Sequence, residues 1–301
     1  MSKIKSPAFS IMKRIAILGL GLMGGSLGLA LKKHHKTAIV AGYARRSEVL
    51  EMALKRQVVD EVFEDPAQAV CHADMVILCV PIYTIYALAE SCKSGLGSDT
   101  IVTDVGSTKS MITKEMSKLL ENHSATFIGS HPIAGSEEQG ITAAQAELYK
   151  DSVVVITPAP DMEESVIKKT QIFWESIGSI SHVMSPEEHD KVLAQTSHLP
   201  HMMASLLAAT VGHAEPLKHT GLFCGTGFRD ASRLAEGSPE VWVDIIKSNQ
   251  QQTLKEMKAF RDQQQIFIEK LEQHDYDGIK GILETSRSKR RLLLEYSQKK
   301  I

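Results

Sequence analysis

The chain has 301 residues, a length that suggests two domains. Apolar residues make up 43% of it and charged residues 23%, which is typical of soluble globular proteins and excludes a disordered or collagen-like chain. Thirty-four basic side chains against 36 acidic ones leave a net charge of −2, which argues against a dedicated nucleic-acid-binding protein. The four cysteines form no C-x-x-C pair, so we expect free thiols in a reducing cytosol rather than disulfides or a zinc site.

The first part of the chain alternates short apolar runs with helical stretches, behind a loose N-terminal extension at residues 1–11. Strands are predicted at residues 14–19, 38–44, 75–80, 101–105, 126–128 and 152–157. Helices are predicted from the glycine-rich segment to about 34, and over 47–56, 111–120 and 162–177, with Ser47 as an N-cap. This alternation predicts an α/β fold: a Rossmann-type doubly wound, mostly parallel sheet covered by helices on both faces.

One uncharged segment, residues 15–31, could be mistaken for a signal peptide or a membrane span. It is short for a span and holds five glycines, and no small-residue cleavage site follows it. We therefore expect no membrane association.

The pattern changes after about residue 184. Ser185-Pro186-Glu187-Glu188 has a Ser N-cap, Pro at the first helical position and Glu three residues after the cap. We expect no strand beyond this point, and one long helix is predicted from Trp242 to Leu271. The sequence therefore predicts a dinucleotide-binding domain over 1–182 and an all-helical domain over 183–301, which ends in a packed basic helix.

The glycine motif Gly19-x-Gly21-x-x-Gly24 directly follows the first predicted strand. The first glycine permits a tight turn, the second lets the backbone approach a pyrophosphate, and the third lets the helix pack against the sheet. We expect a dinucleotide here, with a glycine-rich turn without ligand as the alternative. The other predicted contacts at this site are Leu20, Leu22 and Met23 of the loop, and Val80 and Pro81 after a neighbouring strand.

The end of the second predicted strand indicates which dinucleotide is bound. An NAD site usually has an acidic residue there, which binds the ribose hydroxyls. This chain has Ala44, Arg45, Arg46 and Ser47 instead. Guanidinium groups bind a 2′-phosphate, so we predict NADP, with NAD as the alternative if the two arginines are only solvated surface residues.

Four polar segments carry the remaining chemical signals. In chain order they are Asp104-Val105-Gly106-Ser107-Thr108-Lys109, Ser130-His131-Pro132-Ile133-Ala134-Gly135-Ser136-Glu137, Ser197-His198-Leu199-Pro200-His201 and Gly227-Phe228-Arg229-Asp230-Ala231-Ser232-Arg233. The first two follow predicted strands, whose ends line the ligand crevice of open α/β sheets.

With these motifs, in this order, the chain resembles the prephenate and arogenate dehydrogenases of tyrosine biosynthesis. The resemblance runs from Gly19 to about Asn249 and rests on GLGLMGGSLG, DVGSTK, SHPIAGSEEQG, SHLPH and GFRDASRLAEGSPEVW. It implies an NAD(P) domain, a helical domain through which a homodimer forms, and oxidative decarboxylation of a cyclohexadienyl substrate.

The resemblance also implies residue roles. His131 would be the base that accepts the substrate hydroxyl proton, a role that suits a neutral imidazole, with Ser107 bound to the same hydroxyl. Without these neighbours, His131 would be interpreted as a capping or core histidine. Substrate binding would fall to Ser197, His201, Arg233, Asp230, Glu137 and Trp242, among which Arg233 binds a carboxylate unless it forms a structural salt bridge instead.

The choice of substrate depends on the residues after His131. Glu137 matches an acid that is common in the family, whereas Glu138 stands where relatives often have a basic residue. An acid at this place would favour the ammonium group of arogenate. We expect prephenate as the substrate and keep arogenate, or both, as the alternative.

Two other functions are compatible with parts of the sequence. A β-hydroxyacid dehydrogenase would use a lysine of the helical domain, for which Lys191 is the candidate, and a non-catalytic NADP-sensing regulator would not need His131. A metal site at His198 and His201 lacks a third ligand, so no metal is expected. No regulatory domain is expected after the helical domain, so tyrosine feedback would act at the active site.

Overall fold

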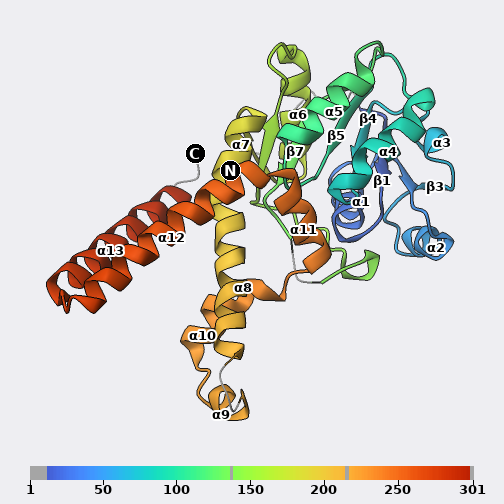
Figure 1. The fold of residues 1–301 in the computed structure, drawn as a ribbon. Helices are drawn as coiled ribbons and strands as arrows, with labels where there is room; N and C mark the ends of the chain where they lie inside the picture. Colours follow the sequence, from blue (N-terminus) through green and yellow to red (C-terminus); the bar gives the residue numbers. More distant parts are fainter. Residues whose placement is uncertain (1–11, 136–137, 214–216, 299–301) are drawn as a thin grey trace, which may run out of the picture. The chain divides into compact units, whose positions relative to one another are not determined.

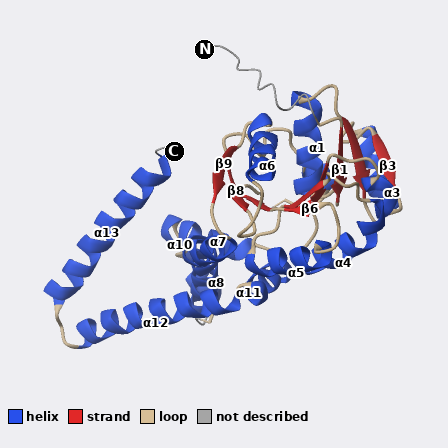
Figure 2. Ribbon diagram, turned by 90° about the horizontal axis from the view of Figure 1, so that it is seen from above, coloured by secondary structure: helices blue, strands red, loops and turns tan. Residues whose placement is uncertain are grey.

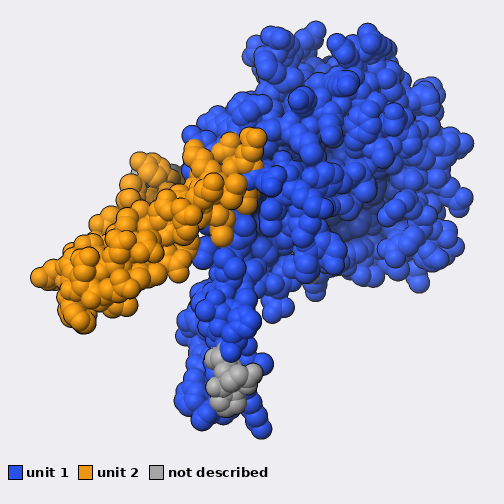
Figure 3. Space-filling view, viewed as in Figure 1, with its two compact units in different colours: residues 1–250 blue, residues 251–301 orange. Residues whose placement is uncertain are grey.

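The computed structural model describes residues 12–135, 138–213 and 217–298. The chain divides into two compact units, residues 1–250 and 251–301 (Figure 3). All four cysteines are free, as expected. None of the described helices is long and apolar enough to cross a membrane.

A six-stranded parallel sheet lies at the centre of the first unit, with strand order β3-β2-β1-β4-β5-β6 (Figure 1). The strands are β1 (Arg14–Leu18), β2 (Ile39–Tyr43), β3 (Glu61–Phe63), β4 (Met75–Leu78), β5 (Ile101–Asp104) and β6 (Thr126–Phe127). The chain adds strands on one side of β1 as far as β3 and then on the other side from β4. This order confirms the doubly wound fold and places a ligand crevice at the carboxyl ends of β1 and β4.

Helices cover both faces of this sheet (Figure 2). They are α1 (Leu22–His34), α2 (Ser47–Lys55), α3 (Pro66–Val70), α4 (Ile82–Cys92), η2 (Lys93–Gly95), α5 (Ser110–Leu120) and α6 (Glu164–Ser176). Side chains of α1, α2 and α6 form one apolar core with the sheet, and those of α3, α4 and α5 form another. The predicted N-cap at Ser47 is wrong: Ser47 is the first helical residue, and Arg46 holds the cap position without a side-chain hydrogen bond.

A second sheet of three strands has the order β7-β8-β9, with β7 (Gly129–Pro132), β8 (Val153–Thr157) and β9 (Ile180–Val183). His131 lies within β7, an edge strand of this second sheet that pairs antiparallel with β8. Our prediction that His131 follows the end of a strand of the parallel sheet is therefore wrong. The missing N–H of Pro132 is tolerated at such an edge. Strands β3 and β9 were not predicted, because they are short and partly exposed.

Beyond Val183 the described residues form helices only, as predicted. In the first unit these are α7 (Pro186–Leu193), the π-helical segment η4 (Ala194–His198), α8 (Leu199–Gly212), α9 (Leu217–Leu222), α10 (Thr226–Ser232), η5 (Arg233–Glu236) and α11 (Pro239–Ser248). The Ser185 hydroxyl accepts a hydrogen bond of 3.1 Å from the backbone N–H of Glu188, so the predicted start of α7 is confirmed. A functional boundary between residues 182 and 183 stays a prediction.

The second compact unit is a pair of helices, α12 (Gln250–Glu272) and α13 (Tyr276–Gln298). The single helix predicted from Trp242 to Leu271 is wrong, because the helical pattern breaks at Asn249, between α11 and α12. The basic C-terminal segment is helical, and its leucines at 292–294 are exposed in the single chain.

A buried carboxylate joins the two sheets. Asp104, at the end of β5, binds the ammonium group of Lys109, and both side chains are fully buried. The same carboxylate accepts hydrogen bonds from the backbone N–H groups of Gly106 at 2.8 Å and Ser130 at 3.1 Å. Because Ser130 belongs to β7, this carboxylate fastens β7 and the 104–110 loop to β5.

We expect Lys109→Met to lower the free energy of unfolding by about 3–5 kcal/mol, because it leaves the Asp104 carboxylate buried without its cation. The double variant Asp104→Asn/Lys109→Met removes both charges and should lose less. Urea denaturation followed by circular dichroism measures both. A Lys109→Met midpoint equal to that of the wild type would show that the pair does not stabilise the fold.

Candidate active site

The glycine loop has the geometry of an anion-binding turn. Gly19 has φ +104°, and a Cβ there would lie 2.3 Å from the carbonyl oxygen of Cys79. A Cβ on Gly24 would lie 1.9 Å from the carbonyl oxygen of Gly19, whereas a Cβ on Gly21 would meet nothing within 4 Å. The loop is therefore closed on the protein side and open at Gly21, directly before the N-terminus of α1. This cradle fits the pyrophosphate of a dinucleotide.

A cleft of about 1220 Å³ opens beside this loop. Eight of the predicted cofactor residues line it: Gly19, Leu20, Gly21, Ala44, Arg45, Arg46, Val80 and Pro81. Four do not: Leu22, Met23, Gly24 and Ser47. The cleft is also lined by Gly140, Ile141 and Thr142, which the sequence analysis did not single out.

Two cations lie at the β2 end of the cleft. Arg45 and Arg46 are both exposed, and neither guanidinium has a hydrogen bond or ion pair within the part of the chain that the structure describes. Because they have no such partners, the arginines are available to an anionic ligand. Glu48 also lines the cleft.

The segment that follows β7 is hydrogen-bonded to the end of α2 and to α1, the helix of the glycine loop. The Arg56 guanidinium donates hydrogen bonds to the carbonyl oxygens of Ile141 and Ala144. The Tyr149 hydroxyl donates to the carbonyl oxygen of Met23 at 2.8 Å. Gly140, Ile141 and Thr142, which follow β7 in the chain, thus form part of the lining of the dinucleotide cleft, whereas His131 itself does not line it.

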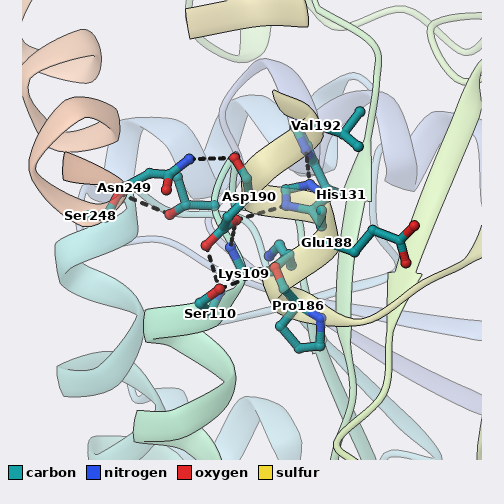
Figure 4. A network of polar contacts seen from close by, with 12 residues as sticks. Lys109, Ser110, His131, Pro186, Glu188, Asp190, Val192, Ser248 and Asn249 are labelled. Carbon is teal, nitrogen blue, oxygen red and sulfur yellow. Dashed lines mark hydrogen bonds and ion pairs between the residues drawn. The ribbon is translucent and has the colours of Figure 1, made fainter. Parts of the chain in front are cut away.

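His131 heads a chain of hydrogen bonds (Figure 4). Its Nδ1 lies 2.8 Å from Nε2 of His189, and Nδ1 of His189 lies 2.8 Å from Oδ1 of Asp190. Burial holds the pKa of His131 well below its usual range, and nearby His189 and Lys109 lower it further. Burial also lowers the pKa of His189, although Asp190 opposes this shift. Both imidazoles are therefore neutral at pH 7.

Asp190 joins this chain to the loop that contains Ser107. Its carboxylate accepts hydrogen bonds from the backbone N–H groups of Lys109 at 2.7 Å and Ser110 at 2.9 Å. Burial raises the pKa of Asp190, but the hydrogen bonds from His189 and Ser110 outweigh burial, and the net shift is downward. The Ser107 hydroxyl is half-buried and has no hydrogen-bond partner among the described residues, so it is available to a ligand.

The chain of contacts continues into α11. Asn249 donates a hydrogen bond of 2.7 Å to the backbone carbonyl of Asp190, and its amide nitrogen lies 3.4 Å from Nδ1 of His198. Burial lowers the pKa of His198 to about 4. The His198 ring meets Trp242 edge to face, with the ring centroids 6.1 Å apart.

Trp242 in turn stacks on His201, with ring centroids 3.5 Å apart and an interplanar angle of 12°. A Cβ on Gly237, directly after η5, would lie 2.6 Å from the indole nitrogen of Trp242. Continuous contacts therefore connect three of the predicted site residues, His131, Trp242 and His201.

The other predicted substrate residues lie outside this series of contacts. Ser197 lies in the π-helical turn and is half-buried, while Asp230 and Arg233 are exposed at α10 and η5. Neither Asp230 nor Arg233 is hydrogen-bonded to His131. Glu137 lies outside the described residues. Lys191, the base in the rival β-hydroxyacid dehydrogenase hypothesis, is exposed on α7.

Sequence reasoning missed His189, Asp190 and Asn249. We used the segment around Glu187 and Glu188 only as a helix-start signal, so the next two residues received no role. The helix that carries His189 and Asp190 is mostly polar, so its pattern does not mark these two residues as buried.

Two family models match the chain. The model of the nucleotide-binding domain of prephenate dehydrogenase matches residues 27–183, and that of its dimerization domain matches residues 185–285. The cyclohexadienyl dehydrogenase of Zymomonas mobilis is 37% identical over 242 residues, which are 80% of this chain and 82% of that protein. The prephenate dehydrogenase of Lactococcus lactis is 33% identical over 287 residues, 94% of this chain and 78% of that protein.

A solved structure shows the same fold. It is the crystal structure of prephenate dehydrogenase from Aquifex aeolicus in complex with hydroxyphenyl propionate and NAD+, with a TM-score of 0.87 and 28% identity. The match covers 94% of this chain and 98% of that one. Together with the glycine cradle and its adjoining cleft, these matches show that the chain belongs to the prephenate dehydrogenase family of NAD(P)-dependent oxidoreductases.

Proposed function

We propose that the protein catalyses, in the cytoplasm, the oxidative decarboxylation of prephenate to 4-hydroxyphenylpyruvate, with NADP as cofactor. The observation that carries this proposal is the position of His131, a neutral histidine that hydrogen bonds through His189 and Asp190 connect to the loop containing Ser107. The prephenate dehydrogenase of Lactococcus lactis, similar over most of this chain, supports the assignment of the substrate.

In this reaction the residues of the chain bind the substrate and move one proton. His131 accepts the proton of the ring hydroxyl, and Ser107 donates a hydrogen bond to the same oxygen. The bound nicotinamide supplies the acceptor for the hydride that leaves the carbon carrying this hydroxyl. Loss of carbon dioxide then makes the ring aromatic. The lowered pKa of His131 keeps it in the proton-accepting form at neutral pH.

The two substrate carboxylates require cations or fixed donors. We assign one carboxylate to the guanidinium of Arg233, with His201 and Ser197 as further donors. Trp242 holds the His201 ring by stacking on it. Asp230 and Glu137 complete the predicted substrate site as groups that shape the cleft.

Replacing His131 by Ala should lower kcat on prephenate by about 10²–10⁴-fold, because the reaction loses its general base. The formation of NADPH, followed by its absorbance, measures the rate. His182→Ala is a matched control, since His182 is exposed on β9 and pairs with Val155 from the side opposite His131. The same assay with arogenate decides between the two substrates. A wild-type enzyme that turns over neither substrate would contradict the proposal, and a higher kcat/KM for arogenate would replace prephenate by the alternative that Glu138 favours.

The two exposed arginines of the cleft support NADP as the cofactor. A 2′-phosphate at the β2 end of the cleft would find Arg45 and Arg46 without other partners in the described chain. The acid that would bind the ribose hydroxyls of NAD is absent from residues 44–47.

We expect Arg45→Ala/Arg46→Ala to lower kcat/KM for NADP by at least about 10-fold, because it removes two charge-assisted contacts with the phosphate. The value for NAD should change little. Lys55→Ala, at an exposed position of the helix α2 that follows the two arginines, controls for the loss of surface charge. Equal losses with both cofactors, or a wild-type preference for NAD, would contradict this assignment.

We also infer that the protein forms a homodimer through its helical part. Large apolar side chains are exposed along α12 and α13, among them Leu254 at 51%, Leu271 at 52% and Leu293 at 67% exposure. Exposed apolar surface of this extent is typical of a protein–protein interface. The family model that matches residues 185–285 is described as a dimerization domain.

Sedimentation velocity at micromolar concentration should therefore give a particle of about twice the chain mass of 33.1 kDa. Dilution tests whether the dimer is stable. A monomer at micromolar concentration would contradict this inference.

A further inference from the structure

The hydrogen-bond chain behind His131 has a direction that fixes where its protons lie. This inference rests on the proposed function, since it assigns the proton-accepting atom of His131. The chain joins three elements: His131 on β7, His189 and Asp190 on α7, and the loop before α5 (Figure 4).

The direction is set by Asp190. Its Oδ1 accepts the backbone N–H of Lys109 and its Oδ2 accepts that of Ser110. Backbone N–H groups can only donate, so both oxygens of Asp190 act as acceptors. Nδ1 of His189, 2.8 Å from Oδ1, must then be the donor of the third hydrogen bond.

A neutral imidazole carries one N–H, so His189 with its proton on Nδ1 has an unprotonated Nε2. This nitrogen lies 2.8 Å from Nδ1 of His131 and can only accept. Nδ1 of His131 must therefore carry the proton of that ring. The second nitrogen of His131, Nε2, has no hydrogen-bond partner among the described residues.

We propose that Asp190 and His189 are positioning residues that hold His131 with its proton on Nδ1, and so leave the lone pair of Nε2 free to accept the proton of the substrate hydroxyl. In the step itself the O–H bond of the substrate breaks and an N–H bond forms on Nε2 of His131. The Nδ1 proton of His131 can then pass to Nε2 of His189, which places the positive charge next to the carboxylate of Asp190. No oxidant or further reactant enters this proton transfer.

The surroundings favour this charge transfer. Lys109, whose ammonium group is paired with Asp104, faces His131 from the 104–110 loop, and His198 faces it from η4. The charge of Lys109 disfavours a positive charge that stays on His131, and the neutral ring of His198 offers it no compensation. Lys109 also lowers the pKa of His189, but His189 is hydrogen-bonded to the carboxylate of Asp190, which raises it. The same carboxylate fixes the loop that contains Ser107.

Two variants of His189 test this proton relay, by which we mean the hydrogen-bond chain from His131 through His189 to Asp190. His189→Leu removes the acceptor, so His131 should lose its fixed Nδ1–H form, and kcat should fall by about 10²–10⁴-fold with a smaller change in KM. His189→Gln offers an amide oxygen as acceptor and should keep that form, but it cannot take the proton, so kcat should fall less. Two-bond ¹H–¹⁵N spectra of the free enzyme distinguish a protonated from an unprotonated ring nitrogen.

His35→Leu is the matched control, because His35 is a half-buried histidine that is hydrogen-bonded to Ser176, outside the site. It should leave both the His131 spectrum and kcat unchanged. The relay is overturned if wild-type His131 carries its proton on Nε2, or if kcat of His189→Leu stays within about threefold of the wild type. If His189→Leu does not fold, a wild-type kcat in His189→Gln overturns the proton transfer to His189.

The spectrum of the wild type requires no substrate, so it separates the two proposals. An Nδ1-protonated His131 in an enzyme that turns over neither prephenate nor arogenate would support the proposed proton position and contradict the proposed function. An active enzyme with an Nε2-protonated His131 would do the reverse.

Discussion

The need to partner two buried carboxylates organises the site. Asp104 is partnered by the ammonium group of Lys109 and by the N–H groups of Gly106 and Ser130. Asp190 is partnered by His189 and by the N–H groups at the start of α5. A buried charge without such partners would cost several kcal/mol, so the segments that supply them have little freedom to move. The loop at 104–110 lies between the two carboxylates and is bound by both, which fixes the place of Ser107.

This arrangement connects the parallel sheet with the helices that follow it. Asp104 ends β5, Ser130 precedes His131 on β7, and Asp190 lies on α7. Asn249 at the end of α11 adds a hydrogen bond to the backbone of Asp190. Groups from four elements are thus joined in one polar network that includes the His131 imidazole, through contacts that require specific geometry. Such preorganisation is what a proton transfer at a fixed distance demands.

The sequence predicted the parts of this site that have a local signal. The glycine motif and the arginines after β2 stand at fixed offsets from predicted strands, so their place in the cleft followed from the doubly wound fold. His131 was recognised through a resemblance, but its strand was misplaced, because Ser130, His131 and Pro132 do not have the apolar pattern of a strand. His189 and Asp190 were missed because their partners are 58 and 81 residues away in the chain, and no local pattern announces such contacts.

The low pKa values of His131 and His189, taken alone, make them weak bases, whereas a proton-accepting site needs a strong one. In the proposed reaction the substrate changes this balance, because it brings two carboxylates into a site that contains the neutral ring of His131. Negative charge next to an imidazole stabilises its protonated form and raises its pKa. His131 would therefore be neutral before the substrate arrives and more basic once it is bound. The same buried network that suppresses protonation in the free enzyme thus keeps the base available over a wide pH range, while the substrate itself supplies the driving force for the proton transfer.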